Sequence, residues 1–192
     1  QKKIKNSCGT CNACNNICPT NAFISPYKLD ARKCISYLTI EHKSHIESQY
    51  RKSIGNRIFG CDDCLAICPW NKFAKINSDI EIDINNKLTL PPLSELIDLD
   101  ENKFKEIFAG TPIRRLGYER FIRNALIAAG NSKEKALIEN IIKKLDHKST
   151  LIRCMAVWAL YKLSTKDFLQ ERQKRLSEEK DKNVQNEWKL IK

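Results

Sequence analysis

The sequence predicts an α+β protein in two parts, a cysteine-rich unit of mixed structure at residues 1–74 and a helical unit at residues 111–192, joined by an acidic connector at residues 75–110. Eight of the nine cysteines lie within the first 68 residues. Apolar residues at helical spacing begin after Thr111 and recur about thirty residues later. The net charge of the three segments changes from +6 to −4 to +9. With 192 residues, each unit can bury a modest core of its own.

The composition predicts a cytoplasmic protein that does not enter a membrane. No stretch approaches the roughly 20 apolar residues that cross a bilayer, and the N-terminal QKKIKNS lacks the apolar core of a signal peptide. The chain starts at Gln1, close to the first cysteine, so we expect it to be the later part of a longer protein. Its net charge of +11 suits polyanionic partners, although a lysine-rich composition with solvated helix faces is an alternative explanation.

Four cysteines near the N-terminus form the clearest chemical motif. The spacing is C-x2-C-x2-C-x3-C-P, formed by Cys8, Cys11, Cys14, Cys18 and Pro19. In this motif three thiolates bind one [4Fe–4S] cluster and the fourth binds the other cluster of a pair. Loops of two residues bring successive sulfurs to neighbouring corners of the iron–sulfur cube. The motif therefore predicts a ferredoxin-like domain with two clusters.

The second half of the pair, in GCDDCLAICPW, has the same motif without its first cysteine. Crossed ligation assigns four cysteines to the first cluster: Cys8, Cys11, Cys14 and Cys68. It leaves only three for the second cluster: Cys18, Cys61 and Cys64. Cys34 is the only other cysteine in this unit, and including it gives each cluster four ligands.

Zinc is the alternative metal for these cysteines. Eight thiolates would also hold two zinc ions, but zinc ribbons use well-separated C-x2-C pairs rather than a run of four that ends in Cys-Pro. The ninth cysteine, Cys154, lies in an apolar helical pattern and is expected to be a buried hydrophobic residue. The three histidines have no ligand spacing. Asp62 and Asp63 have a simple interpretation as turn residues whose side chains accept backbone N–H bonds.

Helices are predicted from the connector onward. LPPLSELIDLDENKF predicts an extended linker followed by a short helix that Ser94 caps. TPIRRLG predicts a helix with Thr111 as its N-cap and Pro112 as its first residue, ending at Gly117. A longer helix follows in YERFIRNALIAAG, and KALIENIIKKL supplies its partner.

The helical unit repeats with a period of thirty residues. The matched pairs are Ile122 with Ile152, Arg123 with Arg153, Ala129 with Ala159 and, more weakly, Trp158 with Trp188. One pair of helices per thirty residues is near the short end of the HEAT-like range. The sequence therefore predicts a small stack of HEAT-like hairpins, with an accidentally periodic helical bundle as the alternative.

Beyond the cysteine spacing, the chain resembles the C-terminal half of the epoxyqueuosine reductases. The resemblance rests on CGTCNACNNICPTNAF, ARKCISYLTIEH, FGCDDCLAICPWN and TPIRR, and runs from Cys8 to at least residue 163. It implies an oxidoreductase that reduces epoxyqueuosine to queuosine at the tRNA wobble base, with two [4Fe–4S] clusters delivering electrons to cobalamin. It also implies that this chain is the electron-delivery and tRNA-binding portion, inactive without an N-terminal cobalamin domain that contains the proton donor.

The resemblance also implies binding residues and partners. If cobalamin lies against the second cluster, residues beside that cluster's ligands contact it, and these are Ser36, Tyr37 and Asp62. Three arginines are expected to bind tRNA phosphates: Arg114, Arg115 and Arg120. Solvated helix faces are the alternative explanation for those arginines. The implied partners are a tRNA with a queuosine-type anticodon, a low-potential electron donor and a separate N-terminal cobalamin-binding half.

Two other functions remain open. A stand-alone ferredoxin-type electron carrier would use the helical unit to dock a redox partner. An inactive RNA-binding protein would use the clusters only to stabilise its fold. Titration with tRNA distinguishes the carrier from an RNA binder, and turnover after addition of the N-terminal half distinguishes the enzyme from both.

Overall fold

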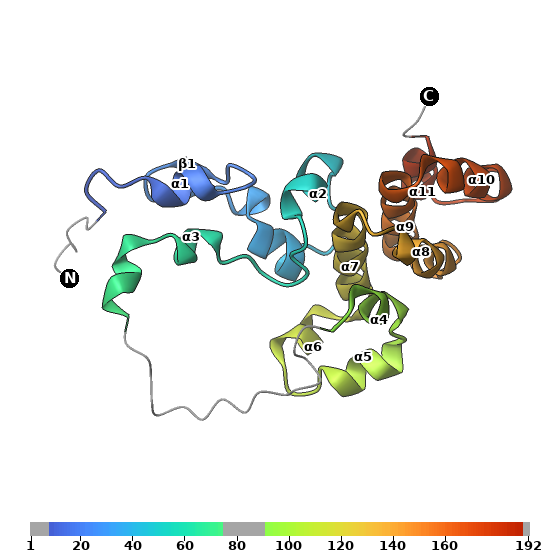
Figure 1. Ribbon diagram of the computed structural model, residues 1–192, viewed down its shortest axis with the longest axis horizontal. Coiled ribbons are helices and arrows are strands. Elements are labelled where there is room, and N and C mark those ends of the chain that lie inside the picture. The colour runs from blue at the N-terminus through green and yellow to red at the C-terminus, as the bar shows by residue number, and fades with distance from the viewer. Residues whose placement is uncertain (1–7, 75–90, 190–192) are drawn as a thin grey trace.

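The computed structural model describes residues 8–74 and 91–189. The molecule is elongated (Figure 1), with short helices, turns and a small hairpin at one end and a stack of longer helices at the other. α2 (Ser48–Ile54) and α7 (Tyr118–Ser132) meet between the two ends. Among the described residues, no helix is long and apolar enough to cross a membrane.

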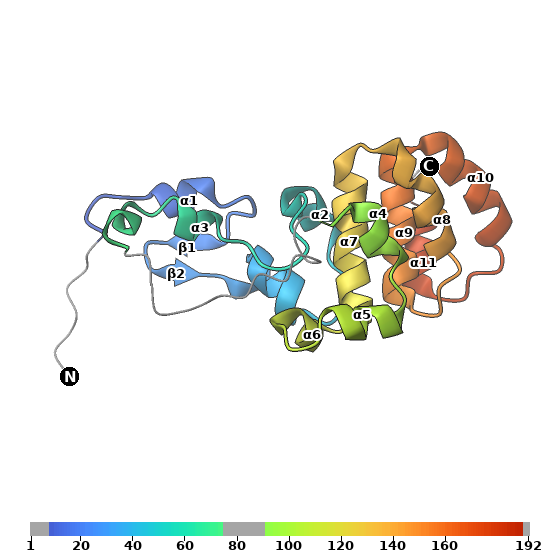
Figure 2. The ribbon, with the colours of Figure 1, turned by 60° about the horizontal axis from the view of Figure 1, so that its bottom comes forward.

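The cysteine-rich part consists of short elements joined by turns. Besides α2 they are α1 (Ala13–Ile17), β1 (Phe23–Ser25), β2 (Lys28–Leu29), η1 (Ala31–Lys33), the π-helix η2 (Tyr37–Glu41), α3 (Asp63–Ala66) and η3 (Pro69–Phe73). β1 and β2 pair antiparallel, and in the described part of the chain this hairpin is the only sheet. α1 packs against α3, so the two cysteine motifs lie side by side (Figure 2).

The remaining elements are helices that stack around α7. They are α4 (Leu93–Asp98), α5 (Glu101–Ile107), α6 (Pro112–Leu116), η5 (Lys135–Leu137), α8 (Ile138–Lys144), α9 (Thr150–Leu163), α10 (Thr165–Arg175) and α11 (Lys182–Trp188). α9 lies along α7 (Figure 2), and both helices are buried over most of their length. Gly130 on α7 allows this close approach, because a side chain there would overlap the ring of Trp158.

The connector differs from its prediction where the structure describes it. Residues 75–90 lie outside the described residues. After them, the predicted short helix is present as α4, and α5 follows it. Both helices pack against α7 and bury Ile97 and Phe104, so they belong to the helical core. Ser94 does not cap α4, because Pro92 occupies the N-cap position and Ser94 lies inside the helix. The fixed φ of proline suits this extended entry into a helix.

The predicted limits of α6 are confirmed. Thr111 is the N-cap, Pro112 opens the helix and Gly117 ends it with φ of 87°. The Thr111 hydroxyl makes no capping bond and instead donates to the carbonyl of Phe108 at 2.9 Å. A positive φ is accessible to glycine without strain, which explains the residue at this sharp turn into α7.

The thirty-residue period matches the arrangement of the helices. α7 is followed by η5 and α8, and α9 is followed by α10. Both members of each matched apolar pair are buried: Ile122 and Ile152, Ala129 and Ala159, and Trp158 and Trp188. The matched apolar residues are therefore core residues of α7, α9 and α11.

The two ends of the molecule are joined by buried polar contacts. Arg51 on α2 forms a bidentate ion pair with Glu187 on α11, with N–O distances of 2.6 and 2.9 Å. Its guanidinium also lies 5.7 Å from the ring centroid of Trp158. The amide of Asn131 on α7 donates to the carbonyls of Arg51 and Gly55. These contacts fix the cysteine-rich part against the helices.

Candidate metal centre

Four thiols from three segments line one cavity in the cysteine-rich part. The cavity has a volume of about 60 Å³, and its thiols are those of Cys18, Cys34, Cys61 and Cys64. Apolar residues from β1, β2 and the neighbouring turns form most of the remaining wall: Pro19, Ala22, Phe23, Leu29 and Ile35. These four cysteines are the ones that the sequence assigned to the second cluster, so the structure brings the lone Cys34 to the other three.

Local hydrogen bonds hold Cys34 and Cys61 in place. Cys34 ends η1, where its N–H donates to the carbonyl of Ala31 at 3.0 Å. The Ser36 hydroxyl donates to the carbonyl of Cys61 at 3.1 Å and accepts from the N–H of Cys61 at 3.0 Å. This reciprocal pair joins the two cysteine segments beside the cavity.

The polar environment of Cys18 favours its thiolate. Partial burial raises the pKa of this thiol, but hydrogen bonds from the backbone of Ala22, Thr20 and Asn21 outweigh burial and lower the pKa overall. The N–H of Ala22 lies 3.3 Å from the sulfur. Hydrogen bonds that a thiolate accepts stabilise its charge and so lower the pKa of the thiol. The thiolate is the form that binds a metal. For Cys61 and Cys64, burial raises the pKa of the thiol.

The cysteines assigned to the first cluster lie around α1 and after α3. Cys8 and Cys11 are exposed, and the N–H of Cys11 donates to the carbonyl of Cys8 at 3.0 Å. The Tyr27 hydroxyl accepts from the N–H of Cys8 at 3.4 Å. Hydrogen bonding to Cys8 and the nearby charges of Cys8 and Cys14 raise the pKa of Tyr27. Cys68 follows α3, which packs on the helix that carries Cys14. Joint ligation by these four thiols stays a prediction.

The thiols do not converge on a single point. Within residues 8–74 and 91–189, no three Cys, His, Asp or Glu side chains are close enough together to chelate one metal ion. A tetrahedral zinc site, with Zn–S bonds of about 2.3 Å, requires four sulfurs in such a tight group. A four-iron cube separates its ligand sulfurs more widely. Four thiols can serve as donors to either metal, so the preference for an iron–sulfur cluster over zinc rests on the cysteine spacing.

The structure also places the ninth cysteine, Cys154, as well as Asp62 and Asp63, the two aspartates that follow Cys61. Cys154 is buried on α9, where its thiol lies 3.8 Å from the carbonyl of Asn183 and burial raises its pKa strongly, which confirms the expected hydrophobic role. Asp63 pairs with Arg57 at 2.6 Å. Asp62 occupies the N-cap position of α3, but its carboxylate makes no capping bond there.

The three residues nominated for cobalamin are close together beside Cys61. Ser36 bonds to the backbone of Cys61, Tyr37 is the next residue, and Asp62 follows Cys61 in the chain. Tyr37 is 37% exposed and Asp62 is exposed, so both side chains lie at the surface near the cavity. The Ser36 hydroxyl is already hydrogen bonded on both sides, which favours a role in positioning Cys61.

The three nominated arginines have different environments. Arg115 is exposed and pairs with Glu41 at 2.8 Å. Arg114 is exposed and, after Lys105 and Lys148, helps to lower the pKa of Glu101. Arg120 donates to the backbone carbonyls of Ile40 and Arg115 at 3.0 and 3.3 Å, so its guanidinium already joins α7 to η2. Arg114 and Arg115 therefore remain the more accessible pair.

Two buried side chains of α7 also reach the cysteine segments, and the sequence interpretation missed them as site residues. Arg123 donates to carbonyls of η2 and of the loop after it, and Asn124 donates to Thr39 and Ile58. The available signal was a pair of polar residues within the apolar pattern RFIRNALIAAG. On an otherwise buried helix, such residues require polar partners from a neighbouring segment.

Comparison with known proteins places these features in a family context. Residues 7–71 match the family described as 4Fe-4S double cluster binding domain. The epoxyqueuosine reductase of Xanthomonas campestris pv. campestris is 46% identical over 157 residues, covering 80% of this chain and 43% of that protein. The epoxyqueuosine reductase of Escherichia coli is 40% identical over 157 residues, covering 82% of this chain and 41% of that protein.

Solved structures show the same relationship. A crystal structure of epoxyqueuosine reductase with a tRNA-Tyr epoxyqueuosine-modified stem loop superposes with a TM-score of 0.88 at 31% identity, covering 97% of this chain and 50% of that one. The Bacillus subtilis enzyme superposes with a TM-score of 0.87 at 32% identity, covering 98% of this chain and 52% of that one. The predicted resemblance is confirmed, and the chain spans about half the length of the relatives it matches.

Proposed function

Because the chain is related to epoxyqueuosine reductases over about half of their length, we propose that it forms the iron–sulfur and tRNA-binding portion of an enzyme that reduces epoxyqueuosine to queuosine at the tRNA wobble base. The observation that carries this proposal is the cavity lined by Cys18, Cys34, Cys61 and Cys64. Those thiols come from three segments far apart in the sequence, and a generic core would not require all four at one place. The proposed substrate makes the cytoplasm the site of action.

The reaction determines what this portion supplies. Conversion of an epoxide to an alkene consumes two electrons and two protons and releases one water molecule. Iron–sulfur clusters supply one-electron transfers. We assign the first cluster to Cys8, Cys11, Cys14 and Cys68, and the second to Cys18, Cys34, Cys61 and Cys64. In this assignment the backbone N–H of Ala22 and the Thr20 hydroxyl, which bond the Cys18 sulfur, also stabilise negative charge at the second cluster.

Cobalamin is the second cofactor of the proposal. Tyr37 and Asp62 would contact it from the exposed surface next to Cys61, while Ser36 orients the Cys61 backbone. The fit is supported by the exposed Asp62 carboxylate next to Cys61, which makes no capping bond to α3. The opposite face of the cofactor and the proton donor would come from the portion of the relatives that this chain does not match. A low-potential electron donor completes the set of partners.

The helical part is proposed to be a HEAT-like stack that binds tRNA. Its support is the equivalence of α7 and α9, which bury matched residues thirty positions apart. Residues 111–192 have a net charge of +9. Arg114 and Arg115 are exposed at the start of this part, where guanidinium groups would pair with phosphates.

The test uses the whole 192-residue chain with clusters reconstituted without oxygen. The unmatched portion of the Escherichia coli relative is added as a separate polypeptide with cobalamin and a low-potential reductant. Queuosine formation in epoxyqueuosine-containing tRNA is measured by mass spectrometry of the nucleosides. We expect conversion that requires both polypeptides. Binding of tRNA without conversion would favour an inactive RNA-binding protein, and reducible clusters without tRNA binding would favour a stand-alone electron carrier.

A further inference from the structure

Asn124 joins two of the three segments that carry the second-cluster cysteines, those of Cys34 and of Cys61 and Cys64. We call residues 34–44 the Cys34 arm and residues 57–64 the Cys61 arm. The amide nitrogen of Asn124 donates to the carbonyl of Thr39 on the Cys34 arm and to the carbonyl of Ile58 on the Cys61 arm, both at 2.8 Å. Asn124 is 0% exposed, so water does not compete for these bonds. One side chain thus holds both arms.

The bonds of Asn124 continue to the ligands themselves. Within the Cys34 arm, the N–H of Leu38 donates to the carbonyl of Cys34 at 2.9 Å. The Thr39 hydroxyl donates to the carbonyl of Ile35 at 2.7 Å and accepts from the N–H of Gly60 at 3.0 Å. Gly60 immediately precedes Cys61. Loss of the Asn124 side chain is therefore expected to shift the backbone of both Cys34 and Cys61, because only a few residues and hydrogen bonds separate them from Asn124.

Arg123, the neighbour of Asn124, orients it and holds the Cys34 arm. Its guanidinium donates to the carbonyls of Leu38, His42 and Ser44 at 3.0, 2.8 and 2.7 Å. Its Nε donates to the side-chain oxygen of Asn124 at 3.1 Å. That bond directs the amide nitrogen of Asn124 toward the two arms.

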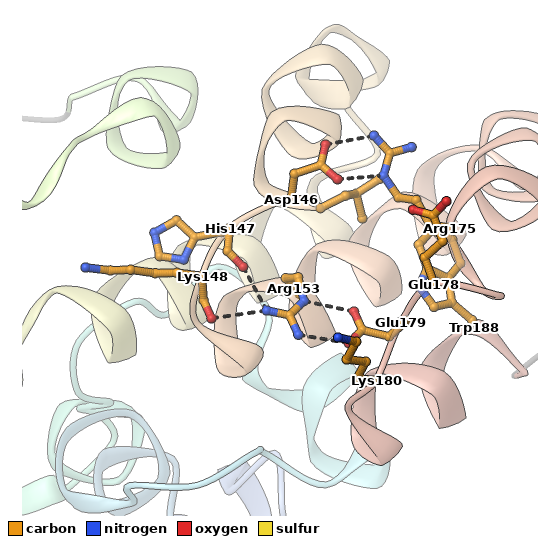
Figure 3. A pocket seen from close by; sticks show the side chains of 10 residues that line it. Asp146, His147, Lys148, Arg153, Arg175, Glu178, Glu179, Lys180 and Trp188 are labelled. Carbon is orange, nitrogen blue, oxygen red and sulfur yellow. Dashed lines mark hydrogen bonds and ion pairs between the residues drawn. The ribbon is translucent and has the colours of Figure 1, made fainter.

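Arg153, which lies thirty residues after Arg123 in the sequence period, differs from Arg123 in its bonding partners. Arg153, thirty residues later, also donates to carbonyls of the loop before its own helix, those of His147 and Lys148, but it is bidentate to Glu179 as well (Figure 3). Among the described residues, the guanidinium of Arg123 bonds to three backbone carbonyls and to the Asn124 side chain, and to no carboxylate. Apart from its bond to Asn124, each bond of Arg123 is made to the Cys34 arm.

We propose that Asn124, oriented by Arg123, is a positioning residue for the second cluster: it fixes the separation of the Cys34 arm from the Cys61 arm, and thereby the geometry of their thiolates. The inference rests on the proposed assignment of Cys34, Cys61 and Cys64 to one cluster. Groups that orient metal ligands change metal affinity about 10- to 100-fold when they are lost. A comparable effect is expected here, confined to one of the two clusters.

The test compares Asn124→Ala with Asn131→Ala in the reconstituted chain. Asn131 is the matched control, because it lies on the same helix and its amide also donates to two carbonyls of the cysteine-rich part, those of Arg51 on α2 and of Gly55, which follows α2. α2 contains no cysteine. The readouts are the electron paramagnetic resonance signals of the reduced clusters and the rate of iron release to a chelator.

For Asn124→Ala we expect about half of the iron to be released at least about tenfold faster, with a shift or loss of one resonance signal. The signal affected should be the one that Cys34→Ser removes. Asn131→Ala should leave both signals and both release rates unchanged. Equal effects of the two alanine variants, or unchanged signals and rates in Asn124→Ala, would overturn the inference.

A second variant covers the case in which Asn124→Ala does not fold. Thr39→Val keeps the side-chain shape but removes the hydroxyl. This breaks the bond to Gly60, which joins the same two arms, and the bond to Ile35 within the Cys34 arm. It should shift the same signal, and an unchanged signal in a folded Thr39→Val protein would overturn the inference. Failure of the cluster assignment is distinguishable, because Cys34→Ser would then leave both signals intact whatever the result at Asn124.

Discussion

At the scale of single residues, Cys34 has the greatest chemical consequence. It stands sixteen positions from the nearest cysteine in the sequence, yet its thiol lines the same cavity as those of Cys18, Cys61 and Cys64. Cys154 is the ninth cysteine and is buried between helices instead. The two residues therefore make a matched pair for testing the cluster assignment.

Replacing Cys34 with serine should remove or alter one cluster. The first cluster keeps its four thiolates, while the second keeps three and is expected to be lost or converted to a three-iron form. Iron should fall from about eight per chain to roughly four to seven, with loss of one resonance signal. Cys154→Ala should change neither quantity. Full iron content in Cys34→Ser, together with cluster loss in Cys154→Ala, would show that the assignment is wrong.

Arg51 tests how strongly the two parts of the molecule are joined. Its side chain and that of Glu187 are 4% and 11% exposed, so Arg51→Ala leaves a carboxylate with little access to water. We expect a loss of about 3–5 kcal/mol in the free energy of unfolding, measured by urea denaturation. The control is Arg115→Ala, which breaks the exposed pair with Glu41 and should cost less than about 1 kcal/mol. Similar losses for the two variants would contradict this account.

At the scale of secondary-structure elements, the contact of α7 with α9 depends on one missing side chain. A Cβ atom at Gly130 would overlap Cζ3 of Trp158 and lie 2.9 Å from its Cε3 and 3.1 Å from the Cα of Ala159. Ala159 contributes a backbone atom to this contact, and backbone atoms of a packed helix move less easily than a side chain.

Gly130→Ala should therefore destabilise the protein. Overpacking costs about 1–3 kcal/mol, and alanine returns about 1 kcal/mol through its better helix propensity. We expect a net loss of up to about 2 kcal/mol in thermal or urea unfolding. Combining it with Trp158→Leu should give a smaller loss than the sum of the two single changes, because the overlapping ring is gone. Strict additivity of the two changes would contradict the packing explanation.

Much of the element order was predictable from local chemistry. Thr111, Pro112 and Gly117 give clear start and stop signals, and the apolar spacing of the following helix set the position of α7. The prediction at Ser94 was wrong, because a capping residue type was given more weight than the proline that precedes the helix. Acidic composition similarly concealed the apolar Ile97 and Phe104, which bring α4 and α5 into the core.

The part of the candidate site that depends on the spacing of cysteines along the chain was predictable. Short spacings fix which cysteines are neighbours, and counting ligands was enough to include Cys34. The hydrogen bonds that join the Cys34 arm to the Cys61 arm were not predictable, because Asn124 lies 85 residues from Thr39 and 66 residues from Ile58 in the sequence. No local pattern encodes contacts of that range. The role of Arg120 was hidden for the same reason, since its partner Ile40 lies 80 residues away.

At the scale of the whole molecule, charge predicts how tRNA would bind. The log–log slope of affinity against salt concentration should be about −0.7 for each phosphate contact, using the value for single strands. Arg114→Ala combined with Arg115→Ala should therefore reduce the slope by up to about 1.4. The control is the double variant Lys162→Ala and Lys166→Ala, on α9 and α10. It also removes two positive charges and should change the slope less. Salt-independent binding would contradict a phosphate contact.

The 192 residues alone are expected to leave epoxyqueuosine-containing tRNA unchanged, even with clusters, cobalamin and reductant present. Tyr37 and Asp62 lie at an open surface, and the chain spans about half the length of the relatives it matches. Nucleoside mass spectrometry after prolonged incubation measures the result. Queuosine formed by this chain without a second polypeptide would contradict the proposed division of labour.

The bonds from Asn124 to the two arms also bear on when each cluster site can be completed during synthesis of the chain. During synthesis, Cys64 leaves the ribosome roughly 60 residues before Asn124, which at about 5–20 residues per second is an interval of roughly 3–12 s. Throughout that interval the nascent chain has all four thiols of the second site but not the helix that joins their segments. If the second site requires these bonds, as proposed, its stable loading would follow the emergence of α7.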